Sequence, residues 1–297
     1  MRLSHILRDF RNFFLLSRPL NVLISVLAFI VACFLAKGHS WSFFTDPRFY
    51  ATSLTIAGIA ASGYWINDAY DFRIDRVNKP KRTIVNALLS VKKVLTVYFV
   101  FNFLILACSA FYLAKYHHQY DITFINVLSV VLLFSYASYF KRVSVVGNLL
   151  IAFLTSLVIV LAGYLYVINR DLAFMIAFAF QVTLLREITK DIEDIKGDLQ
   201  FGLRTLPIQM GIRFTKYILG VLYVSFIIST YVPIIVEYVK TGEFLWMYAI
   251  ASVALVQVPS VYLVWIMYRS GHPRNFSRQS TLLKYLIFGG IVSLFFL

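Results

Sequence analysis

The stretch NDAYDFRIDRVNKPKR, from Asn67 to Arg82, directly follows a long apolar segment. It contains three aspartates and five basic residues, although charged residues make up only 14% of the chain and hydrophobic residues 60%. In soluble globular proteins about a quarter of the residues are charged. The composition therefore excludes a water-soluble globule, and we expect an all-α, multi-pass integral membrane protein.

Nine apolar segments are long enough, or nearly so, to cross a bilayer as helices. They cover approximately residues 20–36, 49–66, 94–114, 121–140, 145–168, 171–189, 217–237, 244–268 and 284–297, the last of which is short. If the N-terminus is cytoplasmic, 23 Lys and Arg residues fall on the cytoplasmic side and five on the opposite side. This positive-inside bias predicts a cytoplasmic N-terminus, and it explains the net charge of +14 without any nucleic-acid partner.

The connecting segments predict one membrane domain over residues 1–297. Residues 1–18 are expected to form a helix on the cytoplasmic membrane surface, because apolar residues recur at helical spacing, at Leu3, Ile6, Leu7, Phe10 and Phe14. All loops between the spans are short except two, at about 67–93 and 190–216, and both are predicted to be cytoplasmic. The functional residues are therefore sought in these two loops.

Both long loops open with the same arrangement of acidic residues, spaced i, i+3, i+7: Asp68, Asp71 and Asp75, then Asp191, Asp194 and Asp198. The triplets follow the second and the sixth apolar segment, which suggests two four-helix halves of equal orientation and an extra ninth helix. If the spans continue helically, each triplet stacks its carboxylates on one helix face. Eight of the fourteen acidic residues lie in these two clusters.

Stacked carboxylates repel one another unless cations neutralise them. Carboxylate oxygens suit Mg²⁺ that is held jointly by the protein and the phosphates of a substrate. Basic side chains that could contact phosphate oxygens surround both clusters: Arg73, Arg76, Lys79, Lys81, Arg82, Arg186, Lys190, Lys196 and Arg204. The residues therefore favour a diphosphate–Mg²⁺ site over acids that are merely solvated at helix ends.

The stretches NDAYDFRID and KDIEDIKGD, the second followed by GLRTLPIQMG, resemble the paired aspartate motifs of the UbiA superfamily of intramembrane prenyltransferases. The resemblance covers nearly the whole chain. It implies a helical barrel around a central cavity, with a side opening to lipid and a cytoplasmic cap built from the two long loops. It also implies Mg²⁺ as cofactor and two substrates, a prenyl diphosphate donor and a lipophilic acceptor.

The resemblance also implies roles for individual residues. The expected metal ligands are Asp68, Asp71, Asp75, Asp191, Asp194 and Asp198; the expected catalytic residues are Asp71, Asp75, Asp194, Asp198 and Lys190. Expected substrate contacts are Arg18, Asn21, Asn67, Arg82, Lys141, Arg204 and Tyr139. A wall of aromatic rings that excludes water and stabilises an allylic carbocation is expected from Tyr64, Trp65, Tyr136 and Tyr139, although such residues also form interfacial belts.

Three stretches, SRPLN, REITKDIEDIKGD and TLPIQMG, resemble the branch of geranylgeranylglyceryl phosphate geranylgeranyltransferases, so this lipid phosphate is the expected acceptor. Two departures lie where the acceptor would bind. Arg82 is followed by Thr83 instead of a proline, and Ala137 occupies the expected tyrosine position before Lys141. An aromatic acceptor of the quinone, homogentisate or chlorophyll type remains the alternative. A cation-coupled transporter is disfavoured, because the acids lie at span ends.

Overall fold

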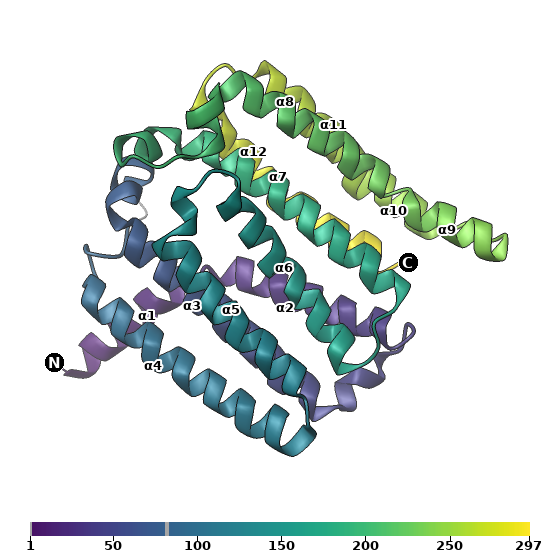
Figure 1. The fold of residues 1–297 in the computed structure, drawn as a ribbon, viewed down its shortest axis with the longest axis horizontal. Coiled ribbons are helices and arrows are strands. Elements are labelled where there is room, and N and C mark those ends of the chain that lie inside the picture. The colour runs from purple at the N-terminus through teal and green to yellow at the C-terminus, as the bar shows by residue number, and fades with distance from the viewer. Residues whose placement is uncertain (1, 81–82) are drawn as a thin grey trace.

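The computed structural model describes residues 2–80 and 83–297, and helices account for 85% of the chain (Figure 1). No strand occurs in this described part. The elements are α1 (Arg2–Leu16), α2 (Pro19–Ala36), η1 (Trp41–Thr45), α3 (Pro47–Asn78), α4 (Val91–Ser109), η3 (Ala110–Tyr116), α5 (Tyr120–Ser138), η4 (Phe140–Arg142), α6 (Val146–Leu165), α7 (Arg170–Gln200), α8 (Leu206–Ser229), α9 (Val232–Thr241), α10 (Trp246–Ser252), η5 (Val253–Gln257), α11 (Val258–Arg269), η6 (Pro273–Asn275) and α12 (Phe276–Leu294).

Helices that can cross a membrane dominate the fold. Among the described residues, seven continuous helical stretches are long and apolar enough: α2, α4 with η3, α5, α6, α7, α8 with α9, and α10 with η5 and α11. The other two predicted segments, 49–66 and 284–297, lie in α3 and α12. Both elements are helical, but neither contains a stretch that is long, apolar and free of charge enough to count as a candidate span. The all-helical membrane class is thus confirmed, whereas the count of nine spans stays a prediction.

The outer surface is strongly apolar, as expected of a protein in lipid. Leu54, Phe103, Phe124 and Ile250 are 73%, 72%, 66% and 67% exposed on four different helical stretches. Water-soluble monomers rarely expose apolar patches that extend over several elements. The apolar surface and the spans together establish an integral membrane protein.

Local sequence signals fix the ends of the two helices that carry the aspartates. Asp46 caps α3, because its carboxylate accepts a hydrogen bond from the backbone N–H of Arg48 at 2.9 Å. The helix stops before Pro80, since the residue preceding a proline disfavours the α conformation. Asn169 caps α7 in the same way, accepting from Leu172 N–H at 3.0 Å, and α7 ends two residues before Gly202, whose φ is +71°.

These boundaries correct the predicted loops. The segments 67–93 and 190–216 are not loops throughout, because α3 continues to Asn78 and α7 to Gln200. The non-helical part of the second segment contains only residues 201–205. Hydropathy predicts the end of a span where charged residues begin, but a helix satisfies its own backbone hydrogen bonds and can continue past the apolar region. Both aspartate triplets therefore lie on helices, as their spacing requires.

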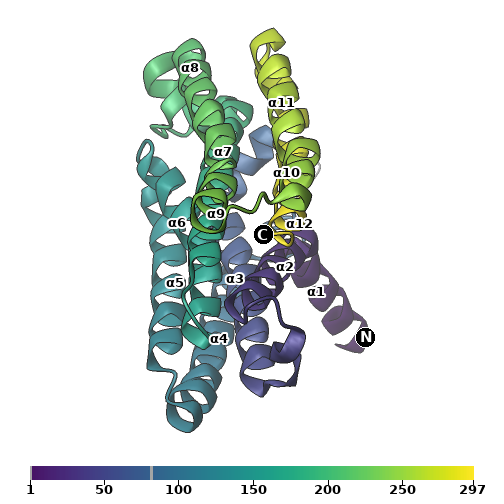
Figure 2. The same ribbon diagram turned by 90° about the vertical axis from the view of Figure 1, so that its right-hand side faces the viewer.

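Six helices, α2, α3, α5, α6, α7 and α12, pack around a common interior. Figure 1 shows α4 along one edge of the molecule and α8 with α11 along the opposite edge. In Figure 2, α1 leaves the bundle at an angle, with its N-terminus projecting from it. The apolar side chains Leu7, Phe10 and Phe14 of α1 are 63%, 74% and 56% exposed. The position of this helix on the membrane surface stays a prediction.

A side-chain clamp joins the ends of α3 and α7. The Asn78 amide nitrogen donates to the backbone carbonyl of Asp194 at 2.9 Å, and the backbone N–H of Gly197 donates to the Asn78 amide oxygen at 2.8 Å. A Cβ atom on Gly197 would lie 2.5 Å from Asn78 Nδ2. Glycine is thus required at position 197, since any side chain would displace the amide that connects the two helices.

Gly197→Ala should destabilise the protein by about 1–3 kcal/mol, because it disrupts two partly buried hydrogen bonds. Thermal unfolding in detergent measures the effect. Gly271→Ala is the matched control, since a Cβ there meets nothing within 4 Å. An unchanged melting temperature for Gly197→Ala would show that the clamp contributes nothing to stability.

Candidate active site

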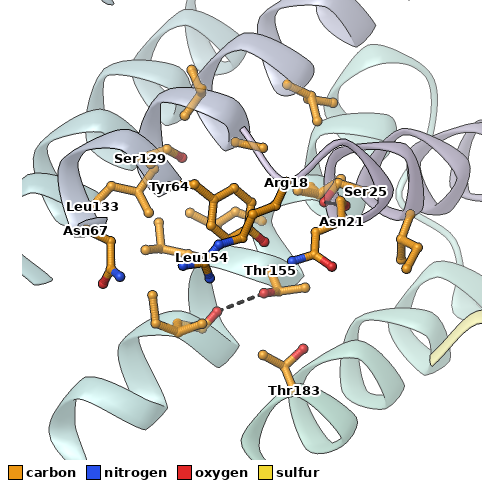
Figure 3. Close-up of a pocket in the computed structure, with 18 of the residues that line it drawn as sticks. Arg18, Asn21, Ser25, Tyr64, Asn67, Ser129, Leu133, Leu154, Thr155 and Thr183 are labelled. Carbon is orange, nitrogen blue, oxygen red and sulfur yellow. Dashed lines mark hydrogen bonds between the residues drawn. The ribbon is translucent and has the colours of Figure 1, made fainter. Parts of the chain in front are cut away.

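The six packed helices enclose a cavity of about 230 Å³ (Figure 3). Its inner part is lined mainly by apolar side chains, among them Ile24, Ile56, Ile59, Leu133, Leu154, Leu157, Val158 and Leu161. Towards the ends of α3 and α7 that carry the aspartates the lining becomes polar and charged: Arg18, Asn21, Tyr64, Asn67, Tyr136, Arg186, Glu187, Lys190 and Lys284. The cavity therefore suits an amphiphile with an apolar chain and a charged head.

The aspartates of α3 lie on one face and have basic partners from other elements. Arg18 Nη2 lies 2.6 Å from Asp68 Oδ1. Lys141, between α5 and α6, forms an ion pair with Asp71, whose side chain is buried. Burial, followed by repulsion from Asp71 and Asp68, raises the pKa of Asp75 to about 6. Asp75 thus lies close to two other carboxylates, and this concentration of negative charge favours binding of a cation.

The aspartates of α7 form a second row next to the first. Asn148 Nδ2 donates to Asp191 Oδ2 at 2.8 Å. Lys79, the first residue after α3, contacts the Asp194 carboxylate at 2.8 Å. Asp198 is only 3% exposed. Because Lys79 and the Asn78–Gly197 clamp both connect α3 to α7 here, the two rows lie at the same end of the molecule.

Arg18 adopts an unusual backbone conformation at the entry to α2. Its φ and ψ of 50° and 65° are left-handed, a region that non-glycine residues seldom occupy. Its guanidinium lies 4.8 Å from the centre of the Tyr64 ring and also contacts Asp68. Figure 3 shows Arg18, Asn21 and Tyr64 around the same space. These contacts offset the backbone strain and hold a cation at the cavity.

The structure brings three of the seven predicted substrate contacts to the cavity. These are Arg18, Asn21 and Asn67, and Lys190, expected to be catalytic, lines the cavity as well. The described lining residues include neither Lys141, which pairs with Asp71, nor any of the six aspartates, which lie beside the charged end of the cavity. Among the described lining residues, neither Tyr139 nor Arg204 occurs. Tyr139 is 63% exposed because α5 ends at Ser138 and turns it outwards. Arg204 is exposed in the short connection between α7 and α8. Arg82 lies outside the described residues.

The predicted aromatic wall is only partly present. Tyr64 and Tyr136 line the cavity. Trp65 is buried elsewhere, since its indole N–H donates to Ser17 Oγ at 2.9 Å and its ring packs edge-on against Phe13. Trp65 therefore fastens α1 to α3, and the prediction for it was wrong. Successive helical residues point about 100° apart, which is why Tyr64 and Trp65 cannot both face the cavity.

Three further charged residues line the cavity: Arg186, Glu187 and Lys284. The sequence indicates Arg186 as one of the basic side chains around the second aspartate cluster, but it does not single out Glu187 or Lys284. Arg186 and Glu187 are bonded to each other at 2.6 Å on α7. Both fall inside the predicted span 171–189, and charges inside a span are rare enough to mark a functional site. Lys284 is likewise a charged residue within a predicted span, at the start of the segment 284–297.

The donor set fits Mg²⁺ held together with a phosphorylated ligand. In the part of the chain that the structure describes, no group of three His, Cys, Asp or Glu side chains is arranged to bind a metal ion without further ligands. Mg²⁺ typically uses one or two carboxylates, water and substrate phosphates. Two neighbouring rows of aspartates beside lysines supply hard oxygen ligands for the metal and separate donors for the phosphates. The remaining ligands would come from the substrate and water.

Comparison with known proteins agrees with this geometry. The model of the UbiA prenyltransferase family matches residues 23–285. The digeranylgeranylglyceryl phosphate synthase of Thermococcus gammatolerans is 31% identical over 288 residues, which are 94% of this chain and 95% of the relative. The enzyme of the same name from Thermococcus kodakarensis is 29% identical over 96% of this chain and 97% of its own length.

Two solved structures have the same fold. One, described as digeranylgeranylglyceryl phosphate synthase in membranes, has a TM-score of 0.69 at 22% identity and covers 96% of this chain and 97% of its own. The other, a UbiA homologue from Archaeoglobus fulgidus bound to GPP and Mg²⁺, has a TM-score of 0.63 at 17% identity and covers 95% and 99%. With the family model matching most of its length, this chain belongs to the UbiA prenyltransferase family.

Proposed function

We propose that the protein transfers an isoprenyl group from a prenyl diphosphate to a glycerol phosphate lipid, in a reaction that depends on Mg²⁺. One observation carries the proposal. Two rows of aspartates, fixed together by Asn78 and Lys79, lie beside a cavity with an apolar interior and a charged end. The rows suit the metal and the diphosphate, and the apolar interior suits an isoprenyl chain.

The ion pairs of the structure indicate how the site receives its donor. Lys79 and Lys141 each neutralise one aspartate, Asp194 and Asp71. When bound, Mg²⁺ would neutralise these carboxylates and the charge that develops on the departing diphosphate. The ammonium groups would then turn to phosphate oxygens, so that carboxylates and lysines exchange partners. Lys190, which lines the cavity, would add a further donor.

Departure of the diphosphate leaves an allylic carbocation, which water would destroy. Tyr64 and Tyr136 present their rings to the cavity at its charged end. Aromatic faces stabilise nearby cations, and their bulk excludes water. We assign the water-excluding wall to these two tyrosines, and not to Trp65 or Tyr139.

The relatives favour a glycerol phosphate acceptor. The two Thermococcus enzymes carry the name digeranylgeranylglyceryl phosphate synthase and align along nearly the entire chain. An aromatic acceptor would use the same aspartates, so the metal site does not distinguish the two. We further propose that the N-terminus and the aspartate rows face the cytoplasm, because 23 of the 28 basic residues then lie on that side.

Asp71→Ala and Asp194→Ala should each lower kcat by about 100-fold or more, since each removes a ligand that stabilises the leaving diphosphate. Prenyl transfer by purified protein in detergent measures the effect, and a chelator should stop the wild-type reaction until Mg²⁺ is restored. Asp121→Ala, an exposed acid in the first turn of α5, is the control. Most of the activity surviving in either variant would exclude that residue from the metal site.

Tyr136→Ala should lower kcat/KM for prenyl transfer more than tenfold, because it opens the cavity wall to water. Tyr139→Ala, three residues later and 63% exposed, should change it less than twofold. Steady-state kinetics of the two variants measure the difference. Equal losses in both variants would mean that the cavity wall is assigned incorrectly.

The acceptor is tested by incubating membranes with labelled geranylgeranyl diphosphate and one acceptor at a time. We expect label in the product from geranylgeranylglyceryl phosphate, and little from a hydroxybenzoate, a naphthoate or homogentisate. Extraction and chromatography of the lipids identify the product. Alkylation of an aromatic acceptor alone would overturn the proposed function while leaving the metal site intact.

A further inference from the structure

A smaller cavity adjoins the apolar interior of the main cavity. Its volume is about 50 Å³, and its walls come from the helices α2, α6, α7 and α12. The two cavities share part of their lining, and three of the shared residues, Ser25, Thr155 and Thr183, have small side chains (Figure 3). The smaller cavity therefore extends the apolar interior between the same helices.

This extension leads away from the aspartate rows. On α7, the lining passes from Lys190 at the charged end to Thr183, which both cavities share, and then to Phe178 in the smaller cavity. On α12, it passes from Lys284 in the main cavity to Leu294 in the smaller one. An apolar chain whose head group lies at the aspartate rows would thus reach the smaller cavity last.

The length of this path corresponds to a definite number of isoprene units. Twelve residues separate Lys190 from Phe178, which is about 18 Å along a helix axis. An extended chain advances about 3.3–3.6 Å for every three bonds, so an isoprene unit, which adds four bonds to its chain, spans about 4.5 Å. The path from the charged end to Phe178 therefore holds about four isoprene units.

Phe178 is held firmly at the far end of the path. Its side chain is buried, and its ring lies 5.0 Å from that of Phe226 on α8. A Cβ atom on Gly290 of α12 would overlap the tip of the Phe178 ring, so the ring occupies the space that a side chain at position 290 would take. Phe178 is thus fixed between two neighbouring helices while it lines the smaller cavity.

We propose that Phe178, seated on Gly290, ends the path of the donor's prenyl chain and so selects a chain of about four isoprene units. This inference rests on the proposed function, because it takes the donor to be a prenyl diphosphate whose head group lies at the aspartate rows. A shorter chain leaves the smaller cavity empty and loses its packing contacts. A longer chain must displace a ring that is packed on both sides, which is costly in a close-packed interior.

The experiment measures equilibrium binding of three probes to purified protein in detergent with Mg²⁺. The probes are farnesyl, geranylgeranyl and geranylfarnesyl thiolodiphosphate, which have three, four and five isoprene units and a sulfur atom in place of the oxygen that joins the chain to the diphosphate. Wild-type protein should bind the geranylgeranyl probe at least tenfold more tightly than the geranylfarnesyl probe. Phe178→Ala should reduce this difference to less than twofold.

The matched control is Phe180→Ala. It removes an aromatic ring of the same size from the same helix, at a position that is absent from the described lining of both cavities. This variant should keep the preference of the wild-type protein. An equal change of preference in both phenylalanine variants would overturn the assignment of Phe178.

Gly290→Ala tests the same contact from the other helix. The new methyl group should push the Phe178 ring into the smaller cavity, so that affinity for the geranylgeranyl probe falls about tenfold and affinity for the farnesyl probe changes less than twofold. The double variant Phe178→Ala with Gly290→Ala should recover binding of the geranylgeranyl probe, because the clash is gone. A loss that persists in the double variant would mean that Gly290 acts through helix packing, and it would overturn the proposed contact.

Two further results would overturn the inference. One is equal binding of the geranylgeranyl and geranylfarnesyl probes by wild-type protein, as expected if the chain leaves the cavity sideways into lipid. The other is an unchanged preference in Phe178→Ala.

Failure of the proposed function gives a different result, because binding of the probes needs no acceptor. If wild-type protein alkylates no glycerol phosphate but Phe178→Ala changes the preferred chain length, the acceptor is wrong and the role of Phe178 stands. If it alkylates geranylgeranylglyceryl phosphate while Phe178→Ala leaves the preference unchanged, the function stands and the role of Phe178 is wrong.

Discussion

Repulsion between carboxylates is the constraint on which this structure depends. Six aspartates lie on the adjoining ends of α3 and α7, and like charges held this close destabilise a fold unless cations approach them. Arg18, Lys79 and Lys141 provide that compensation from three different elements. The acidic rows thereby draw α2, the α3–α4 connection and the α5–α6 connection to one end of the bundle.

The need to compensate these negative charges affects both the stability of the fold and the binding of a metal ion. A carboxylate whose partner is a single lysine can exchange that partner for a divalent ion, and the released lysine becomes a phosphate donor. Burial, together with two neighbouring aspartates, raises the pKa of Asp75 to about 6, so holding a charge on this carboxylate is costly in the absence of a cation. Like charges that would be a defect in a structural helix are useful at a site that receives a metal–diphosphate complex.

Apolar and charged regions divide the cavity between two tasks. The interior offers isoleucine and leucine side chains to an isoprenyl chain, whereas the charged end offers lysine, arginine and tyrosine to the reacting groups. The Asn78–Gly197 clamp keeps the two aspartate rows in register with that end. The clamp leaves no room for a Cβ atom at position 197, so a glycine outside the cavity lining still influences the shape of the site.

Hydropathy and the i, i+3, i+7 spacing are local properties of the chain, so the amino-acid sequence alone predicts the membrane class, the helical segments and the two aspartate rows. Which of these residues contact one another depends on how the helices pack. Trp65 and Tyr139 lie away from the cavity, α3 and α7 continue through the first part of the predicted loops, and Glu187 and Lys284 join Arg186 in the cavity lining. The physical reason is that helix rotation and helix packing, which set where a side chain points, arise from contacts between segments far apart in the chain.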